Sequence, residues 1–231
     1  TGHGGALRGW RSHRLHVRQK RLSVVVLFNH LADAHAAALD ILAAALDAPR
    51  ADGAADLPRP AWLGAYADPE TGLVARVATA GRGRVRLRFG HIPELLTLVA
   101  DGTAGNGRTR LAPEGAGLRM DRPQENFSTI LAPLGGAASP GGLAGRYRSD
   151  ELDAELEIVD AGGALHGGFS GFLGQGRMEL LEPAGPDHWL LPCPRALDHT
   201  PPGDWTLAFA PDRASVEVGC WLARRLPYRR L

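Results

Sequence analysis

The first residues of the chain carry a spacing that could do chemistry. His3, Gly4 and Gly5 form a His-x-Gly triplet. A histidine can orient a substrate through its charge or a hydrogen bond, and a glycine lets an extended substrate backbone lie against the strand that carries it. The same triplet also occurs in ordinary Gly-rich turns. It therefore indicates a substrate-binding strand only where the elements that follow it build a sheet.

Two other patterns resemble phosphate or metal sites but lack the required context. The segment "GTAGNGRT" at 102–109 has the spacing of a phosphate-binding loop, yet Arg108 replaces the lysine and Pro113 excludes the helix that such a loop must open. We expect a hairpin there. His13 and His16 lie three apart in a predicted strand and so point to opposite faces, and the chain has no His-Glu-x-x-His motif or Cys/His cluster. The sequence therefore predicts no metal ion and no cofactor.

The elements around His3 predict part of an α/β unit. Residues 10–17 and 22–29 read as two antiparallel strands joined by the basic turn 18–21. Asp33 can cap a helix that ends before Pro49. The apolar stripe expected on this helix consists of Ala38, Leu39, Leu42, Ala45 and Leu46. Because the second strand is apolar on both faces and one helix covers only one of them, the rest of the sheet must lie elsewhere.

The remainder of the chain predicts antiparallel β structure. Residues 48–61 are rich in Pro, Asp, Ala and Gly and read as a linker. "WLGAYADPETGLVARV" from Trp62 and "LAGRYRSDELDAELEI" from Leu143 share an apolar-x-Gly-x-Tyr head and an alternating strand, so we predict two tandem β-barrels. Their expected bounds are 62–136 and 137–231, with residues 1–47 forming the α/β unit. A single β-sandwich with coincidental Gly-x-Tyr pairs is the alternative.

The order of these elements resembles the C-terminal portion of the D-aminopeptidases, a family within the serine β-lactamase and penicillin-binding-protein superfamily. "GHGGALRGWRS", "SVVVLFN" and the helix after them resemble the end of the catalytic domain, with the His-x-Gly strand beside the nucleophile. The resemblance implies a mainly β chain: a C-terminal fragment of an α/β β-lactamase-like domain, then two antiparallel, eight-stranded, lipocalin-like barrels. It implies His3 as a catalytic residue that orients substrate and Gly5 as a substrate-binding residue.

Two motifs of that family are absent from the chain. The only lysine is Lys20, and Val17 stands three residues before it, so no Ser-x-x-Lys motif is present. Tyr66, Tyr147 and Tyr228 are followed two places on by Asp, Ser and Arg, so no Tyr-x-Asn motif is present. A serine nucleophile needs an adjacent base. We therefore expect this polypeptide to be inactive alone and to need a missing N-terminal catalytic portion as its partner.

The resemblance also implies a specificity loop from the last barrel, and the segment 192–204 is its candidate. Four prolines stiffen this segment, and Arg195, Asp198 and His199 are its polar side chains. In an aminopeptidase the carboxylate of Asp198 would bind the free ammonium group of the substrate through charge-assisted hydrogen bonds. A solvated turn is the alternative for Asp198. The expected substrates are peptides or amides with a free N-terminal D-residue.

Composition narrows the remaining classes of function. The 231 residues are 44% hydrophobic with a formal net charge of +1, so we expect neither nucleic acid nor a membrane surface as partner. The longest apolar run, 24–28, is too short to span a bilayer. Cys193 and Cys220, the only cysteines, are expected to be reduced. A cytoplasmic bacterial location is expected, a homodimer is compatible with the sequence, and the preferred D-residue stays open.

Three functions remain at this stage. The first is the C-terminal part of a serine D-aminopeptidase. The second is a related serine esterase or β-lactamase-like hydrolase, which would share the mechanism and differ in substrate. The third is a non-catalytic lipocalin-like protein that holds a small apolar ligand inside its barrels. A hollow barrel interior would favour the binding protein, and a packed interior would favour the hydrolase family.

Overall fold

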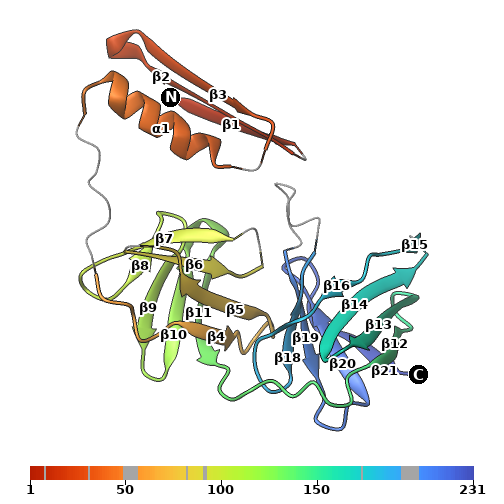
Figure 1. The fold of residues 1–231 in the computed structure, drawn as a ribbon. Helices are drawn as coiled ribbons and strands as arrows, with labels where there is room; N and C mark the ends of the chain where they lie inside the picture. Colours follow the sequence, from red (N-terminus) through yellow and green to blue (C-terminus); the bar gives the residue numbers. More distant parts are fainter. Residues whose placement is uncertain are drawn as a thin grey trace.

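The computed structural model describes residues 1–7, 9–30, 32–48, 57–81, 83–90, 93–172, 174–193 and 203–231. Within these ranges the chain folds into a three-stranded sheet with one α-helix, a closed β-barrel and a second, open β-sheet (Figure 1). The mainly β fold expected from the sequence is thus confirmed.

The N-terminal sheet is antiparallel, with the order β1-β2-β3. Its elements are β1 (Gly2–Leu7), β2 (Trp10–Val17), the 3-10 helix η1 (Arg18–Lys20), β3 (Leu22–Phe28) and α1 (Ala34–Ala45). The carboxylate of Asp33 accepts hydrogen bonds from the backbone N–H groups of His35 and Ala36 at 2.9 and 3.0 Å, so the predicted helix cap is confirmed. Helix α1 lies across one face of this sheet (Figure 1).

The face of α1 that meets the sheet differs from the predicted stripe. Ala34 and Ala38 are buried against Val24 and Val26, with Leu42 packed beside them. Leu39, Ala45 and Leu46 were predicted to face the core but are exposed. The small alanines allow the helix to approach the sheet closely, which turns the larger leucines toward solvent. No helix in the described ranges is both long and apolar enough to cross a membrane.

The first β unit is a closed barrel with the strand order β10-β11-β4-β5-β6-β7-β8-β9. Its elements are β4 (Gly64–Ala67), β5 (Val74–Thr79), β6 (Arg84–Arg88), β7 (Glu94–Leu98), β8 (Ala104–Gly105), β9 (Arg110–Glu114), β10 (Gly117–Arg122), the 3-10 helix η2 (Pro123–Glu125) and β11 (Phe127–Pro133). Its own side chains fill the interior. Those with no exposed surface include Leu87, Leu96, Leu111, Leu118, Met120 and Leu131.

The second β unit is a ten-stranded open sheet, a half-barrel, in place of the expected eight-stranded closed barrel. Its strands are β12 (Gly145–Ser149), β13 (Ala154–Ala161), β14 (Ala164–Gly171), β15 (Gly174–Gln175), β16 (Glu179–Leu180), β17 (Glu182–Pro183), β18 (His188–Leu191), β19 (Trp205–Phe209), β20 (Ser215–Gly219) and β21 (Leu226–Arg230). The path runs from β15 through β14, β13, β12, β21, β20, β19 and β18 to β17, and β16 pairs with β14. Leu143, Leu156 and Leu207 lie in its apolar core.

Both β units begin with the same local structure, which explains the repeat seen in the sequence. The hydroxyl of Tyr66 donates to the carbonyl of Trp62 at 2.7 Å, and the hydroxyl of Tyr147 donates to the carbonyl of Leu143 at 2.9 Å. Two residues before each tyrosine stands a glycine with φ of +151°, a value that side chains disfavour. The shared Gly-x-Tyr head therefore has the same structural role in both units: its glycine adopts the disfavoured φ, and its tyrosine hydroxyl binds a carbonyl four residues earlier.

Candidate functional site

Strand β1 places His3 and Gly5 on one face of the N-terminal sheet. Gly4 pairs with His13, which pairs with Val26, and Val26 is buried against α1. Because side chains alternate along a strand, His3 and Gly5 point to the face away from the helix. His3 is exposed there, on a strand with only one neighbour, β2, among the described strands. Its imidazole is thus exposed on that face of the sheet.

Neighbouring side chains on both faces of the sheet leave little room for a side chain at Gly4 and Gly5 of β1. A Cβ atom on Gly5 would lie 2.7 Å from the Oγ of Ser12, and a Cβ on Gly4 would lie 3.1 Å from the Nδ1 of His13. The ring of His13 in turn lies against the ring of His35 on α1, with centroids 4.3 Å apart. Burial lowers the pKa of His13, and the charge of His35 lowers it further. The His-x-Gly triplet therefore lies within a strand of the N-terminal sheet, paired with β2.

The face that carries His3 is apolar and uncovered. Leu7, Trp10, Val25 and Leu27 are between 60% and 76% exposed. A hollow of about 340 Å³ next to Gly5 is lined by Leu7, Trp10 and Leu27 of this set, together with Ala6, Arg11, Ser12 and Phe28. Apolar side chains gathered on one face mark a surface that another part of a protein covers. The face of this sheet opposite α1 therefore exposes an apolar surface in the part of the chain that the structure describes.

The second candidate region, the segment 192–204, is described only at its two ends. Arg195, Asp198 and His199 lie outside the described residues. At the ends, Leu191 of β18 pairs with Trp205 of β19, so the segment is an insertion between two neighbouring strands. The carboxylate of Asp204 accepts a hydrogen bond from the Nε–H of Arg88 at 2.8 Å. Burial raises the pKa of Asp204, and the positive charge of Arg88 opposes that rise. No sequence pattern pairs these two residues, which lie 116 positions apart.

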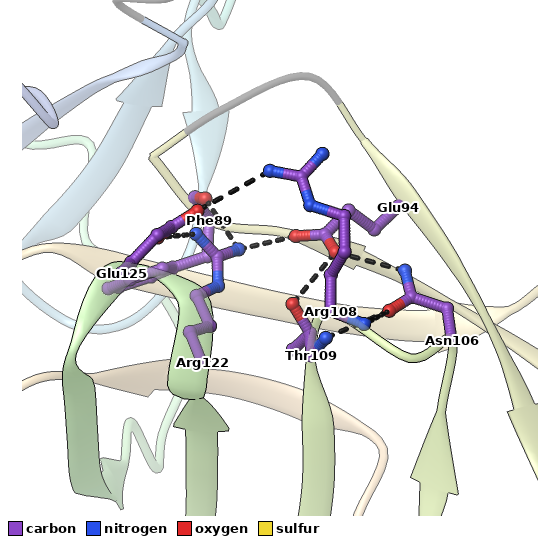
Figure 2. Close-up of polar contacts among 7 residues, drawn as sticks. All are labelled: Phe89, Glu94, Asn106, Arg108, Thr109, Arg122 and Glu125. Carbon is purple, nitrogen blue, oxygen red and sulfur yellow. Dashed lines mark hydrogen bonds and ion pairs between the residues drawn. The ribbon is translucent and has the colours of Figure 1, made fainter. Parts of the chain in front are cut away.

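A third cluster, which the sequence did not suggest, lies at one end of the closed barrel (Figure 2). The guanidinium of Arg122 is 2% exposed and donates to Glu94 at 2.5 Å, to Glu125 at 3.2 Å and to the carbonyl of Phe89 at 3.3 Å. It also lies over the ring of Phe89, 5.3 Å from the centroid. A buried arginine held by two carboxylates is a closed ion network. It is structural, with its charge already compensated.

The segment 102–109 belongs to the same end of the barrel. The side chain of Asn106 accepts the backbone N–H groups of Arg108 and Thr109 at 3.0 and 2.8 Å, and the hydroxyl of Thr109 donates to Glu94 at 2.8 Å (Figure 2). Strand β9 follows directly. The predicted hairpin is confirmed, because these amides bind a side chain of their own turn and open no helix. Within the described ranges, no three His, Cys, Asp or Glu side chains are grouped to hold a metal ion.

Comparison with known proteins identifies relatives over the whole chain. The family model described as D-aminopeptidase, domain B, matches residues 56–229. A D-aminopeptidase of Gluconobacter oxydans is 51% identical over 243 residues, which cover 100% of this chain and 46% of that protein. D-aminopeptidases of Brucella ovis and Brucella melitensis are 45% identical over 235 residues, with 100% of this chain and 45% of each relative covered. The chain therefore spans about half the length of the curated relatives it matches.

Proposed function

Because the chain belongs to the D-aminopeptidase family, we propose that it acts as the C-terminal part of a serine D-aminopeptidase, which releases N-terminal D-amino acids from peptides and amides. The observation that carries this proposal is the match of the whole chain to proteins named D-aminopeptidase. The exposed His-x-Gly strand at the edge of an unfinished sheet supports it. The resemblance drawn from the sequence is confirmed at the level of the family.

In this proposal the residues of the chain bind and orient the substrate, and an N-terminal portion like that of the longer relatives supplies the nucleophile and its base. His3 hydrogen-bonds the substrate beside the reacting carbonyl, and Gly5 lets the substrate backbone approach β1. Asp198 binds the free ammonium group, with Arg195 and His199 beside it in the sequence. The chain alone does not hydrolyse peptides, because a serine without a neighbouring base is a weak nucleophile.

The packed barrel disfavours the binding-protein alternative. A protein that holds a small apolar ligand in its barrel needs an interior wide enough to leave a cavity. In the closed barrel, inward-facing leucines and Met120 have no exposed surface and contact each other. The interior is a hydrophobic core and leaves the outer faces and loops to meet a substrate.

The test uses a chimera that joins the part of the Gluconobacter relative N-terminal to the matched region to Thr1. We expect the chimera to hydrolyse D-alanine amide and D-alanine p-nitroanilide, and the chain alone to hydrolyse neither. The L-enantiomers and N-acetyl-D-alanine p-nitroanilide are the matched substrates. Hydrolysis by the isolated chain, or a folded chimera that is inactive on every D-substrate, would contradict the proposal.

The role of Asp198 is tested in the same chimera. We expect Asp198→Ala to raise KM for the free-amine anilide by roughly 10-fold to 100-fold, since a hydrogen bond to a charged group contributes about 1.5–3 kcal/mol. Hydrolysis of the N-acetylated substrate should change far less. Asp150→Ala, which removes an exposed acid whose side chain is 89% accessible, is the matched control. Equal losses on both substrates would remove Asp198 from the role.

A further inference from the structure

A pair of histidines joins helix α1 to the sheet beside the His-x-Gly strand. The imidazole of His13, on β2, lies against that of His35 in the first turn of α1, with ring centroids 4.3 Å apart and the ring planes tilted by 36°. The same ring packs against β1, where a Cβ atom on Gly4 would lie 3.1 Å from its Nδ1 and a Cβ on Gly2 3.3 Å from its Nε2. His13 therefore contacts both the backbone of β1 and helix α1.

The surroundings of His13 favour the neutral imidazole. Its Nε2 is buried and has no hydrogen-bond partner among the described residues. A protonated imidazole carries an N–H on both ring nitrogens, so it would bury a donor there without an acceptor, which costs free energy. Burial lowers the pKa of His13, and the neighbouring His35 lowers it further. His13 therefore binds a proton less readily in the folded protein than in the unfolded chain.

The titratable and charged groups around His13 come from several elements. Helix α1 contributes His35 and its cap residue Asp33, β1 contributes the charge of His3 from its opposite face, and Arg11 shares the helix-facing side of β2. Strand β3 contributes buried valines to this side. Asp33 is the acid of the group, and its carboxylate already accepts two N–H groups at the start of α1. Protonation of both rings would thus place like charges in contact at a helix N-terminus, where the helix dipole disfavours positive charge.

Helix α1 is sensitive to such a repulsion because its apolar contact with the sheet is small. Its buried residues are Ala34 and Ala38, with Leu42 packed beside them. Hydrophobic stabilisation scales with the apolar area removed from water, and an alanine side chain removes little. The larger Leu39 and Ile41 are exposed. A repulsion between the two imidazoles therefore acts on a helix that few apolar side chains hold in place.

We propose that the His13–His35 contact is a pH-sensitive switch: with neutral rings it holds α1 on the sheet next to β1, and protonation of both rings loosens the helix and the support of the His-x-Gly strand. Because the unfolded chain binds the proton more readily, the contribution of this contact to stability is complete above the ordinary histidine pKa of about 6.5. It is lost as the pH falls through the lowered pKa of His13. An effect on substrate binding along β1 rests on the proposed function.

The first experiment measures the switch in this chain alone, by NMR at about pH 7 and about pH 5. The readout is the protection factor of the α1 amides at 38–45, which corrects exchange for the intrinsic effect of pH. The variants are His35→Gln and the control His16→Gln, which removes an exposed histidine of β2 that hydrogen-bonds Ser23. We expect protection to fall about tenfold at the lower pH in the unchanged protein and in the control, and much less in His35→Gln. No fall, or an equal fall in His35→Gln, overturns the switch.

The ring signals of His13 in the same samples give a second readout. We expect His13 to titrate below its ordinary pKa in the unchanged protein, and its pKa to rise toward the ordinary value in His35→Gln, because a neighbouring charge is removed. The control His16→Gln should leave the pKa of His13 where it was. A pKa of His13 that does not respond to His35→Gln would mean that the two rings are not coupled, and would overturn the switch as well.

The last experiment links the switch to substrate in the chimera described above. We expect kcat/KM for D-alanine p-nitroanilide to fall at acid pH, and the acid limb of this profile to move to lower pH in His35→Gln, with activity at neutral pH within about twofold. An acid limb that stays in place while α1 loses protection would overturn the link to substrate binding. An inactive unsubstituted chimera would overturn the proposed function, and the exchange data alone would then decide the switch.

Discussion

The indole of Trp221 joins the two β units, and its removal tests how strongly they stabilise each other. Trp221 follows β20 of the half-barrel, yet its ring packs edge-on against Phe89 and Phe127 at the end of the closed barrel, with centroids 5.9 and 5.5 Å away. A Cβ on Gly90 would lie 2.8 Å from its ring, so the ring lies directly on the backbone there. The guanidinium of Arg122 lies 5.7 Å from its centroid. Trp221 thus closes one end of the barrel.

We expect Trp221→Ala to lower the free energy of unfolding by about 3 kcal/mol. Truncating a buried Trp or Phe costs roughly 3–5 kcal/mol. The lower end of this range applies because the ring is only partly buried, with each edge-to-face aromatic contact contributing about 0.5–1.5 kcal/mol. For a chain of this size the loss corresponds to a decrease in Tm of roughly 6–12 °C.

Urea unfolding followed by circular dichroism, paired with a thermal scan, measures this loss. The control is Phe172→Ala, which removes an aromatic ring that is 93% exposed and should cost less than about 0.5 kcal/mol. If Trp221→Ala loses less than about 1 kcal/mol, or no more than the control, the barrel end does not depend on this ring and the reasoning is refuted.

Three further predictions concern other parts of the fold. Arg122→Met should lower the free energy of unfolding by about 3 kcal/mol or more in the same urea assay, because it leaves the largely buried carboxylate of Glu94 without its cationic partner; a change below about 1 kcal/mol would contradict the buried network. Burial lowers the pKa of His188, against the opposing charge of Asp187, so the unfolded chain binds a proton more readily. The contribution of this histidine to stability is complete above its ordinary pKa of about 6.5 and is lost as the pH falls through the lowered pKa. Urea unfolding near neutral pH and near about pH 5 should thus show a smaller acid loss in His188→Gln, and an identical loss would exclude His188. Finally, amide exchange in residues 1–48 should be faster than in the closed barrel, because one face of that sheet is uncovered. Equal protection would mean that this sheet is complete as it stands.

The features that sequence reasoning predicted are those encoded in short stretches of the chain. Asp33 caps α1 through amides two and three residues away, and the Gly-x-Tyr heads make hydrogen bonds over four residues. Such contacts leave a pattern that a single sequence reveals. The predicted stripe of α1 was wrong at Leu39, Ala45 and Leu46, since the helical period alone does not say which residues of the apolar side approach the sheet.

The contacts that sequence reasoning missed are those between distant positions. Arg122 meets Glu94 across 28 residues, and Arg88 meets Asp204 across 116. Arginine occurs throughout this chain, and nothing local separates these two from the exposed arginines beside them. The open second sheet was missed for a related reason, because closure depends on which edge strands meet and not on the strands themselves.

The pairing of β12 with β21 has a consequence for how the protein is made. Tyr147 of β12 lies opposite Arg230 of β21, so this edge of β12 can pair only after β21 has been synthesised. The closed barrel has no such delay, since β4 meets β11 by Pro133. During translation the barrel can therefore fold early and serve as a template, while the half-barrel stays incomplete until residue 230 has emerged. Nascent chains stalled before that point would display a folded barrel followed by a sheet in which β12 pairs with β13 on one side only, and chaperones should recognise that open edge.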